Sequence, residues 1–168
     1  SNAPYVACSS ISINDGEFGN NEVEYTETFL LNMNLQNYGS VDASGLSVSV
    51  SSSNPNVMFS QDSINEDLLT AETSLELNDL VTVALNGNFS DQEMVTLEFT
   101  IVDAEGTEWI TTNSFLVNAP SLAFSSYELS NANTTIALGE TVDVTFALDN
   151  VGHAACQNGS VAFASEFY

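Results

Sequence analysis

The chain has 168 residues, of which 43% are hydrophobic, and it carries 23 acidic residues, no lysine or arginine, and a formal net charge of −23. This length and hydrophobicity suffice for a buried core of one or two domains, which excludes a disordered tail. Without basic side chains to neutralise phosphates, the chain has no means of binding nucleic acid. No apolar run approaches the length of a membrane span, so we expect no membrane insertion.

Alternating apolar and polar residues predict β-strands with one buried face along most of the chain. Residues 1–3, Ser-Asn-Ala, resemble the remnant of an expression tag and are left out of this prediction. From Phe29 to Leu35, for example, every odd residue is apolar while Asn32 and Asn34 are polar. The strands predicted in this way are Tyr5–Ile13, Phe29–Leu35, Leu46–Val50, Val81–Leu85, Val95–Ile101 and Trp109–Val117.

Turn-forming residues separate the predicted strands. Residues 37–40, 86–88 and 104–106 supply Asn and Gly, which tolerate positive φ where the chain reverses, and 104–106 predicts a hairpin. Residues 64–73, with Glu66 and Asp67 near their start, are the only segment compatible with a helical turn, and we expect them to form a long connection. Trp109 is expected to fill the core.

Pro120 marks a domain boundary, because proline cannot continue a central strand and the chain then restarts with a new apolar segment. About seven short antiparallel strands over residues 4–119 predict an all-β fold, an immunoglobulin-like antiparallel β-sandwich. Residues 120–168 are expected to form a partial second immunoglobulin-like repeat with the equivalents of its first three strands.

The second repeat follows from an ungapped match of the chain with itself at an offset of 113 residues. Glu27 falls on Glu140, and Asn37-Tyr38-Gly39 falls on Asn150-Val151-Gly152. Such a match indicates an array of similar modules. Half a module leaves an apolar face bare, formed by Val142, Val144, Phe146 and Leu148. It can dock on the first module, exchange strands with another copy in a swapped dimer, or pair with a continuation of the chain.

The first loop is the candidate metal site. It concentrates oxygen donors around two glycines, and calcium prefers about six to eight such ligands. The candidate ligands are Asp15, Glu17, Asn20, Glu22 and Glu27. The alternative is a solvated acidic turn in which Glu27 only accepts backbone hydrogen bonds, and the corresponding loop of the second repeat, from Ser130 to Gly139, has no carboxylate.

Catalytic chemistry has few candidate residues, because the chain has one histidine and no lysine. His153 and Cys156 lie three residues apart in a predicted turn, and we do not expect them to act as a catalytic pair. Cys8 and Cys156 are expected to be unpaired thiols, with a bridge between them as the alternative. The sequence therefore predicts that this chain is not an enzyme.

Several segments carry a family resemblance. They are Ile13-Asn14-Asp15-Gly16, Leu138-Gly139-Glu140-Thr141-Val142, Asn37-Tyr38-Gly39-Ser40-Val41-Asp42-Ala43, and Leu46 to Pro55. In these segments the repeat resembles the adhesion-related immunoglobulin-like modules of secreted Bacteroidetes proteins, in particular the module that follows the catalytic domain of gingipain-like family C25 cysteine peptidases. Tyr25-Thr26-Glu27 departs from the Pro-Gly-Glu or Leu-Gly-Glu of that pattern.

The resemblance implies a secreted or cell-surface accessory, spacer or adhesion module without catalytic residues, whose partners are neighbouring domains of the same protein. The alternative is a module that binds a glycan or a host protein, with calcium as its cofactor. Residues 47–53 and 86–91 are its candidate surfaces. An exposed cluster formed by Tyr5, Tyr25, Tyr38, Trp109 and Tyr127 would favour the alternative.

Overall fold

The computed structural model describes residues 2–16, 19–61 and 63–164. The elements of these residues are β-strands: β1 (Val6–Asn14), β2 (Val23–Glu24), β3 (Thr28–Asn37), β4 (Ala43–Ser52), β5 (Val57–Phe59), β6 (Ser63–Leu69), β7 (Ser74–Leu85), β8 (Glu93–Val102), β9 (Glu108–Asn118), β10 (Leu122–Leu129) and β11 (Val144–Asn150). Within those ranges no helix is long and apolar enough to cross a lipid bilayer.

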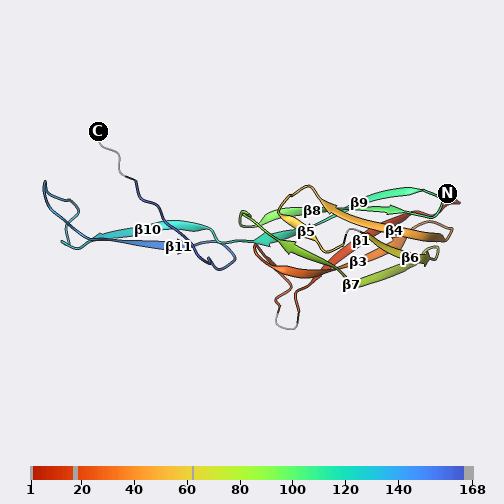
Figure 1. Ribbon diagram of the computed structural model, residues 1–168. Helices are drawn as coiled ribbons and strands as arrows, with labels where there is room; N and C mark the ends of the chain where they lie inside the picture. Colours follow the sequence, from red (N-terminus) through yellow and green to blue (C-terminus); the bar gives the residue numbers. More distant parts are fainter. Residues whose placement is uncertain (1, 17–18, 62, 165–168) are drawn as a thin grey trace.

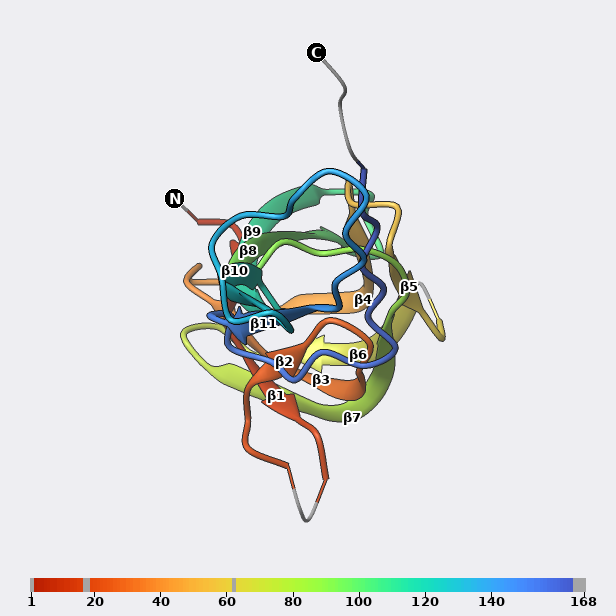
Figure 2. The same cartoon turned by 90° about the vertical axis from the view of Figure 1, so that its left-hand side faces the viewer.

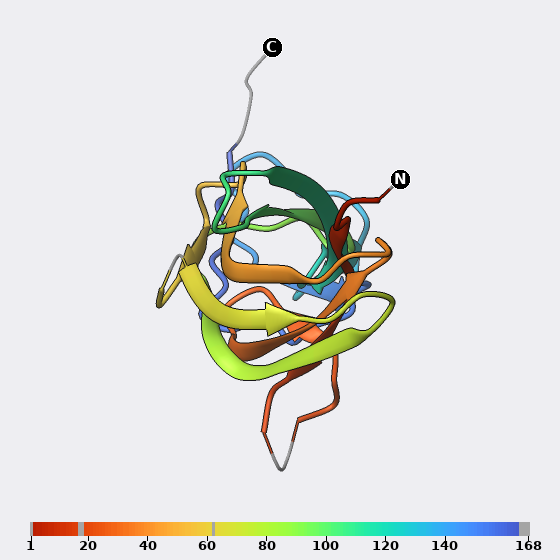
Figure 3. The ribbon, with the colours of Figure 1, turned by 90° about the vertical axis from the view of Figure 1, so that its right-hand side faces the viewer.

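Strands β1 to β9 form two sheets that pack face to face (Figures 1, 2 and 3). One sheet has the order β1-β3-β7-β5 and the other β2-β9-β8-β4-β6. All neighbouring strands are antiparallel except β2 and β9, which pair in parallel through Val23 and Val117. This is an immunoglobulin-like β-sandwich, as the alternation of the sequence predicts.

Alternate residues of the two inner faces form one hydrophobic core. Leu31 and Leu35 of β3 and Leu97 and Phe99 of β8 are completely buried. Trp109 is 9% exposed, so it fills the core as predicted. Because odd residues of β3 point inward, its even residues form an outer surface that is polar except at Leu30.

The segment predicted to be a connection with a helical turn is instead the edge strand β6, and that prediction is wrong. Residues Ala43 to Ser49 of β4 pair with β6, and Ile64 and Leu69 are buried. The polar residues Asn65, Glu66 and Asp67 between them suit an edge strand, where charged side chains limit unwanted pairing with other chains. The short strands β2 and β5 were also not predicted.

Asn37 is a buried brace rather than only a turn residue. Its Oδ1 atom accepts hydrogen bonds from the N–H groups of Tyr5 at 3.2 Å and Gly39 at 2.9 Å. Its Nδ2 atom donates to the carbonyls of Val41 at 2.9 Å and Leu69 at 3.2 Å. Asn37 thus joins the start of β1, the turn after β3 and the end of β6.

Strands β10 and β11 form a separate two-stranded ribbon that extends from the sandwich along its long axis (Figure 1). The ribbon repeats details of β1 and β3, including a register shift between Phe124 and Ser126 that matches the shift between Cys8 and Ser10. Asn150 repeats the brace: its Oδ1 atom accepts from Ser121 and Gly152, and its Nδ2 atom donates to the carbonyl of Ala154. The 113-residue match therefore reflects backbone geometry that β11 shares with β3, while β10 repeats β1 at an offset of 116 residues (124 − 8).

The sequence predicts three strands in the second repeat, and the described residues form two. Residues 151–164, where the third strand is expected, have no strand assignment. They nevertheless turn back toward the ribbon, because Phe163 stacks on Phe146 with ring centroids 4.4 Å apart. Three of the four residues of the predicted bare face are exposed: Val144, Phe146 and Leu148 are 39–42% exposed. The fourth, Val142, precedes β11 and is half-buried.

Candidate functional site

The acidic loop between β1 and β3 projects from the sandwich (Figure 2). Its oxygen atoms mainly bind backbone N–H groups of the loop itself. Asp15 accepts from Asn21 at 2.9 Å, Asn20 accepts from Glu22 at 2.8 Å, and Glu27 accepts from Glu24 at 2.9 Å. The carboxylates thereby hold the loop in shape. A Cβ at position 19 would lie 1.8 Å from Oδ1 of Asp15, so a larger residue there would displace this carboxylate from its hydrogen bond with Asn21.

The structure brings together three of the five predicted metal ligands. Asp15, Asn20 and Glu27 line one shallow hollow, and Glu24, which was not predicted, joins them. Glu22 points elsewhere and accepts a hydrogen bond from Asn118 at 2.9 Å. The fifth, Glu17, lies outside the described residues. Among the described residues, no group of three or more His, Cys, Asp and Glu side chains is arranged to hold a metal ion.

The pKa of Glu27 is raised from 4.5 to about 7. Burial is the largest cause, and the side chain of Glu24 and the charges of Glu24 and Asp15 add to it, while the backbone hydrogen bond from Glu24 opposes it. Glu140 closes the same turn in the second repeat, with its carboxylate accepting from Ala137 at 2.8 Å. There the pKa is lowered, first by this backbone hydrogen bond and then by the amide of Asn131.

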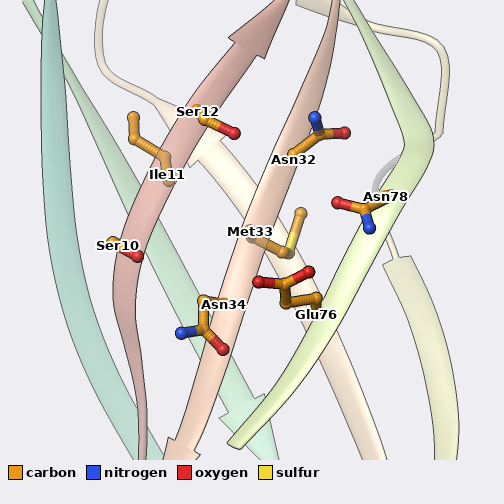
Figure 4. Close-up of a pocket in the computed structure, with 8 residues that line it drawn as sticks. All are labelled: Ser10, Ile11, Ser12, Asn32, Met33, Asn34, Glu76 and Asn78. Carbon is orange, nitrogen blue, oxygen red and sulfur yellow. The ribbon is translucent and has the colours of Figure 1, made fainter.

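A second candidate is a polar hollow of about 150 Å³ on the outer face of β1, β3 and β7 (Figure 4). Hydroxyl, amide and carboxylate groups dominate it. Its lining residues are Ser10, Ile11, Ser12, Asn32, Met33, Asn34, Glu76 and Asn78. Side chains of these types can form hydrogen bonds with polar ligands.

A bulge in β7 creates the polar hollow. The pairing of β3 with β7 shifts between Leu31 and Met33, and Asp79 within the bulge has a positive φ of 58°. The Oδ1 atom of Asn32 accepts a hydrogen bond from the N–H of Asp79 at 2.9 Å and so replaces a lost backbone bond. Bulges of this kind redirect side chains and interrupt strand pairing.

Asn34 gives the polar hollow an unused acceptor. Its Oδ1 atom is buried and, within the described part of the chain, it has no hydrogen-bond partner. Buried polar atoms almost always have a partner, so an exception calls for an explanation such as a bound water or ligand. In the sequence, Asn34 is visible only as part of the polar face of a strand.

The other surfaces predicted to bind a ligand form an open hollow or do not come together. Residues 51–53 contribute with Thr96, Glu98 and Thr112 to an open hollow on the second sheet. The five predicted aromatic residues do not converge, because Trp109 is buried and only Tyr5 and Tyr38 are in contact, with centroids 6.0 Å apart. An aromatic cluster does exist, but it is formed by Phe124, Phe146 and Phe163 on the ribbon.

Asp91 connects the sandwich to the second repeat. Its carboxylate accepts hydrogen bonds from the N–H groups of Ala119 and His153, both at 3.1 Å, and it lies 2.8 Å from Nδ1 of His153. The side-chain hydrogen bond with His153 is the main cause of the lowered pKa of Asp91. Tyr25 adds a contact across the same junction, since its hydroxyl accepts from the N–H of Gln157 at 3.4 Å.

The two cysteines are free, Cys8 buried and Cys156 exposed, so the expectation of unpaired thiols is confirmed. Burial raises the pKa of the Cys8 thiol to about 11, which keeps it protonated. This thiol is therefore suited to packing in the core rather than to nucleophilic chemistry.

No family model matches the chain, and no curated protein does. Among solved structures, a FixG-related protein from Vibrio parahaemolyticus is similar to 68% of this chain and 95% of its own, with 9% identity and a TM-score of 0.40. The PapD-like domain 7 of human CEP192 covers 65% of this chain and 82% of its own, with 15% identity and a TM-score of 0.32. At TM-scores below 0.5 these likenesses give no information on function.

Proposed function

We propose that the chain is a non-catalytic spacer or adhesion module of a secreted or cell-surface protein, of the kind that accompanies gingipain-like peptidases. The main support is the repetition of the Asn37 brace at Asn150, which indicates modules built on one plan and joined in series. The segments that resemble Bacteroidetes adhesion modules support the same proposal. Its partners are then the neighbouring domains of the same protein.

A spacer has to fix the direction of the next module, and the junction provides contacts for this. Asp91 binds the backbone on both sides of the boundary, at Ala119 and at His153. The carbonyl of Ala119 also accepts from the N–H of Ala154 at 3.3 Å. Four residues from three separate segments therefore restrict bending between the sandwich and the ribbon.

Distance measurements between spin labels test the stiffness of the junction. Labels are placed at Glu98→Cys on the sandwich and Glu128→Cys on the ribbon, with Cys156→Ser to remove the exposed native thiol. We expect a narrow distance distribution in this background and a broad one after Asp91→Ala. A broad distribution before that change would contradict the spacer function, and peptide hydrolysis by the purified chain would contradict its non-catalytic character.

The polar hollow favours a second function, binding of a glycan. Sugar hydroxyls both donate and accept hydrogen bonds, so they can satisfy the buried Oδ1 atom of Asn34 and the neighbouring carboxylate of Glu76. A glycan array, followed by NMR titration of any glycan that binds, tests this function. Binding should be lost in Asn34→Ala and retained in the matched control Ser52→Ala on the opposite sheet. If the array shows no binding, the glycan-binding function is rejected and the spacer function remains.

A further inference from the structure

One face of the ribbon is apolar and exposed. Directly paired residues of β10 and β11 lie on the same side, as Phe124 does with Leu148 and Tyr127 with Phe146. The ribbon face consists of Leu122, Phe124, Tyr127, Val144, Phe146 and Leu148, whose side chains are 39–60% exposed. Contiguous apolar surface of this kind marks an interaction site.

The equivalent positions of the first module show what such a face requires. Val6, Cys8, Leu31, Met33 and Leu35 occupy five of these six positions in β1 and β3 and are at most 4% exposed. The sixth, Ile11, is partly buried and packs against the same core. They are covered because β4, β8 and β9 of the second sheet pack over them. The ribbon has the first layer of a sandwich, and the described residues supply no second layer of strands.

The covering of the ribbon face has begun but is incomplete. Phe163 stacks on Phe146 at 4.4 Å, and Phe146 meets Phe124 edge-on at 6.5 Å. Phe163 is itself 66% exposed and Phe124 is 60% exposed. The three rings therefore add an aromatic ridge to the face instead of closing it.

The distribution of charge permits a second copy to approach this face. None of its six residues is charged, and Asp149, whose neighbour Leu148 belongs to the face, points to the opposite side of the ribbon. Most of the 23 acidic residues precede residue 120. Since the ribbon extends away from the sandwich (Figure 1), two ribbons can meet while the acidic sandwiches stay apart.

We propose that the ribbons of two copies of this chain pack face to face and form a symmetric dimer. The face is uncharged, and a second copy carries an equal face of the same length. Each half-exposed phenylalanine ring contributes roughly 100 Å². With the aliphatic residues, complete burial of two faces would remove on the order of 1,000 Å² from water, which is at the lower limit for a biological interface.

Sedimentation equilibrium of the full chain tests the dimer, from about 1 to about 300 µM protein and in about 0.5 M NaCl, where charge repulsion is screened. We expect a reversible monomer–dimer equilibrium that strengthens with salt. Phe146→Ser should weaken it at least tenfold. Ile110→Ser changes an outer residue of β9 that is 56% exposed, and it should leave the dimer unchanged.

Fluorescence of Trp109 verifies that each variant retains its folded sandwich, because this residue is buried in the first module and distant from the ribbon. A monomer at all concentrations would overturn the proposal. So would open-ended aggregates instead of dimers, or equal weakening by Phe146→Ser and Ile110→Ser. Fluorescence energy transfer between copies labelled at Cys156, the exposed cysteine, should follow the same concentration dependence.

Discussion

Replacement of Glu27 by glutamine should remove a pH-dependent part of the stability of the sandwich. Glutamine keeps the length of the side chain and an oxygen that accepts the N–H of Glu24, but it cannot ionise. In the native chain, burial and the neighbouring carboxylates raise the pKa of Glu27 from 4.5 to about 7. The folded state therefore binds a proton that the unfolded chain releases.

This difference in proton binding determines whether the stability rises or falls with pH. The stabilisation is fully present below about pH 4.5 and is lost as the pH rises to about 7. The full shift corresponds to about 3 kcal/mol at about 1.4 kcal/mol for each pH unit. The loop is partly exposed to water, so we expect screening to leave on the order of 1 kcal/mol.

Urea denaturation followed by Trp109 fluorescence at pH 4.5, 6 and 8 measures this effect. The free energy of unfolding of Glu27→Gln, relative to that of the native chain, should increase by about 1 kcal/mol from the lowest to the highest pH. Glu140→Gln is the matched control, because it removes one charge from the same turn of the second repeat, where the pKa is lowered instead. A constant difference between Glu27→Gln and the native chain would refute the reasoning, as would an equal gain in the control.

Three further predictions use the same chain. Asn37→Leu should destabilise the sandwich by about 3 kcal/mol or more in urea denaturation, because it leaves buried N–H and carbonyl groups without partners; a loss below about 1 kcal/mol would contradict the brace. In the native state a thiol reagent should label Cys156 and spare Cys8, which mass spectrometry of the labelled chain can verify. At constant ionic strength, millimolar calcium and magnesium should raise the melting temperature equally over EDTA, since no group of three or more His, Cys, Asp and Glu side chains among the described residues is arranged to hold a metal ion; a rise of several degrees with calcium alone would establish the metal site.

Period-two alternation predicted the strands that have one buried and one exposed face, such as β3 and β8. It failed for β6, because only Ile64 and Leu69 are buried in that edge strand and Glu66 and Asp67 between them resemble the start of a helix. Local pattern reports how many faces of a strand are covered. It cannot report strand pairing, which for β6 depends on β4.

For the candidate sites too, the sequence predicted some features and others required the structure. Composition located the acidic loop, but the direction of each side chain depends on the fold, which turns Glu22 toward Asn118 and places Glu24 beside Glu27. The polar hollow has no sequence pattern of its own, since it arises from a bulge at Asp79 in a strand far along the chain. The recurrence of Asn37 at Asn150 was visible in the sequence, although its role as a brace required the structure.

The position of the two chain ends of the sandwich determines how the module responds to mechanical force. The chain enters β1 at one end of the long axis and passes from β9 to β10 at the other end (Figure 1). Tension along this axis loads the hydrogen bonds of β1 with β3 and of β9 with β8 in shear, so that many bonds share the force. In the ribbon, Leu122 and Asn150 are paired at the junction, and tension applied across them opens one pair after another. The first module is therefore the part suited to bear load, and the ribbon is the part that yields.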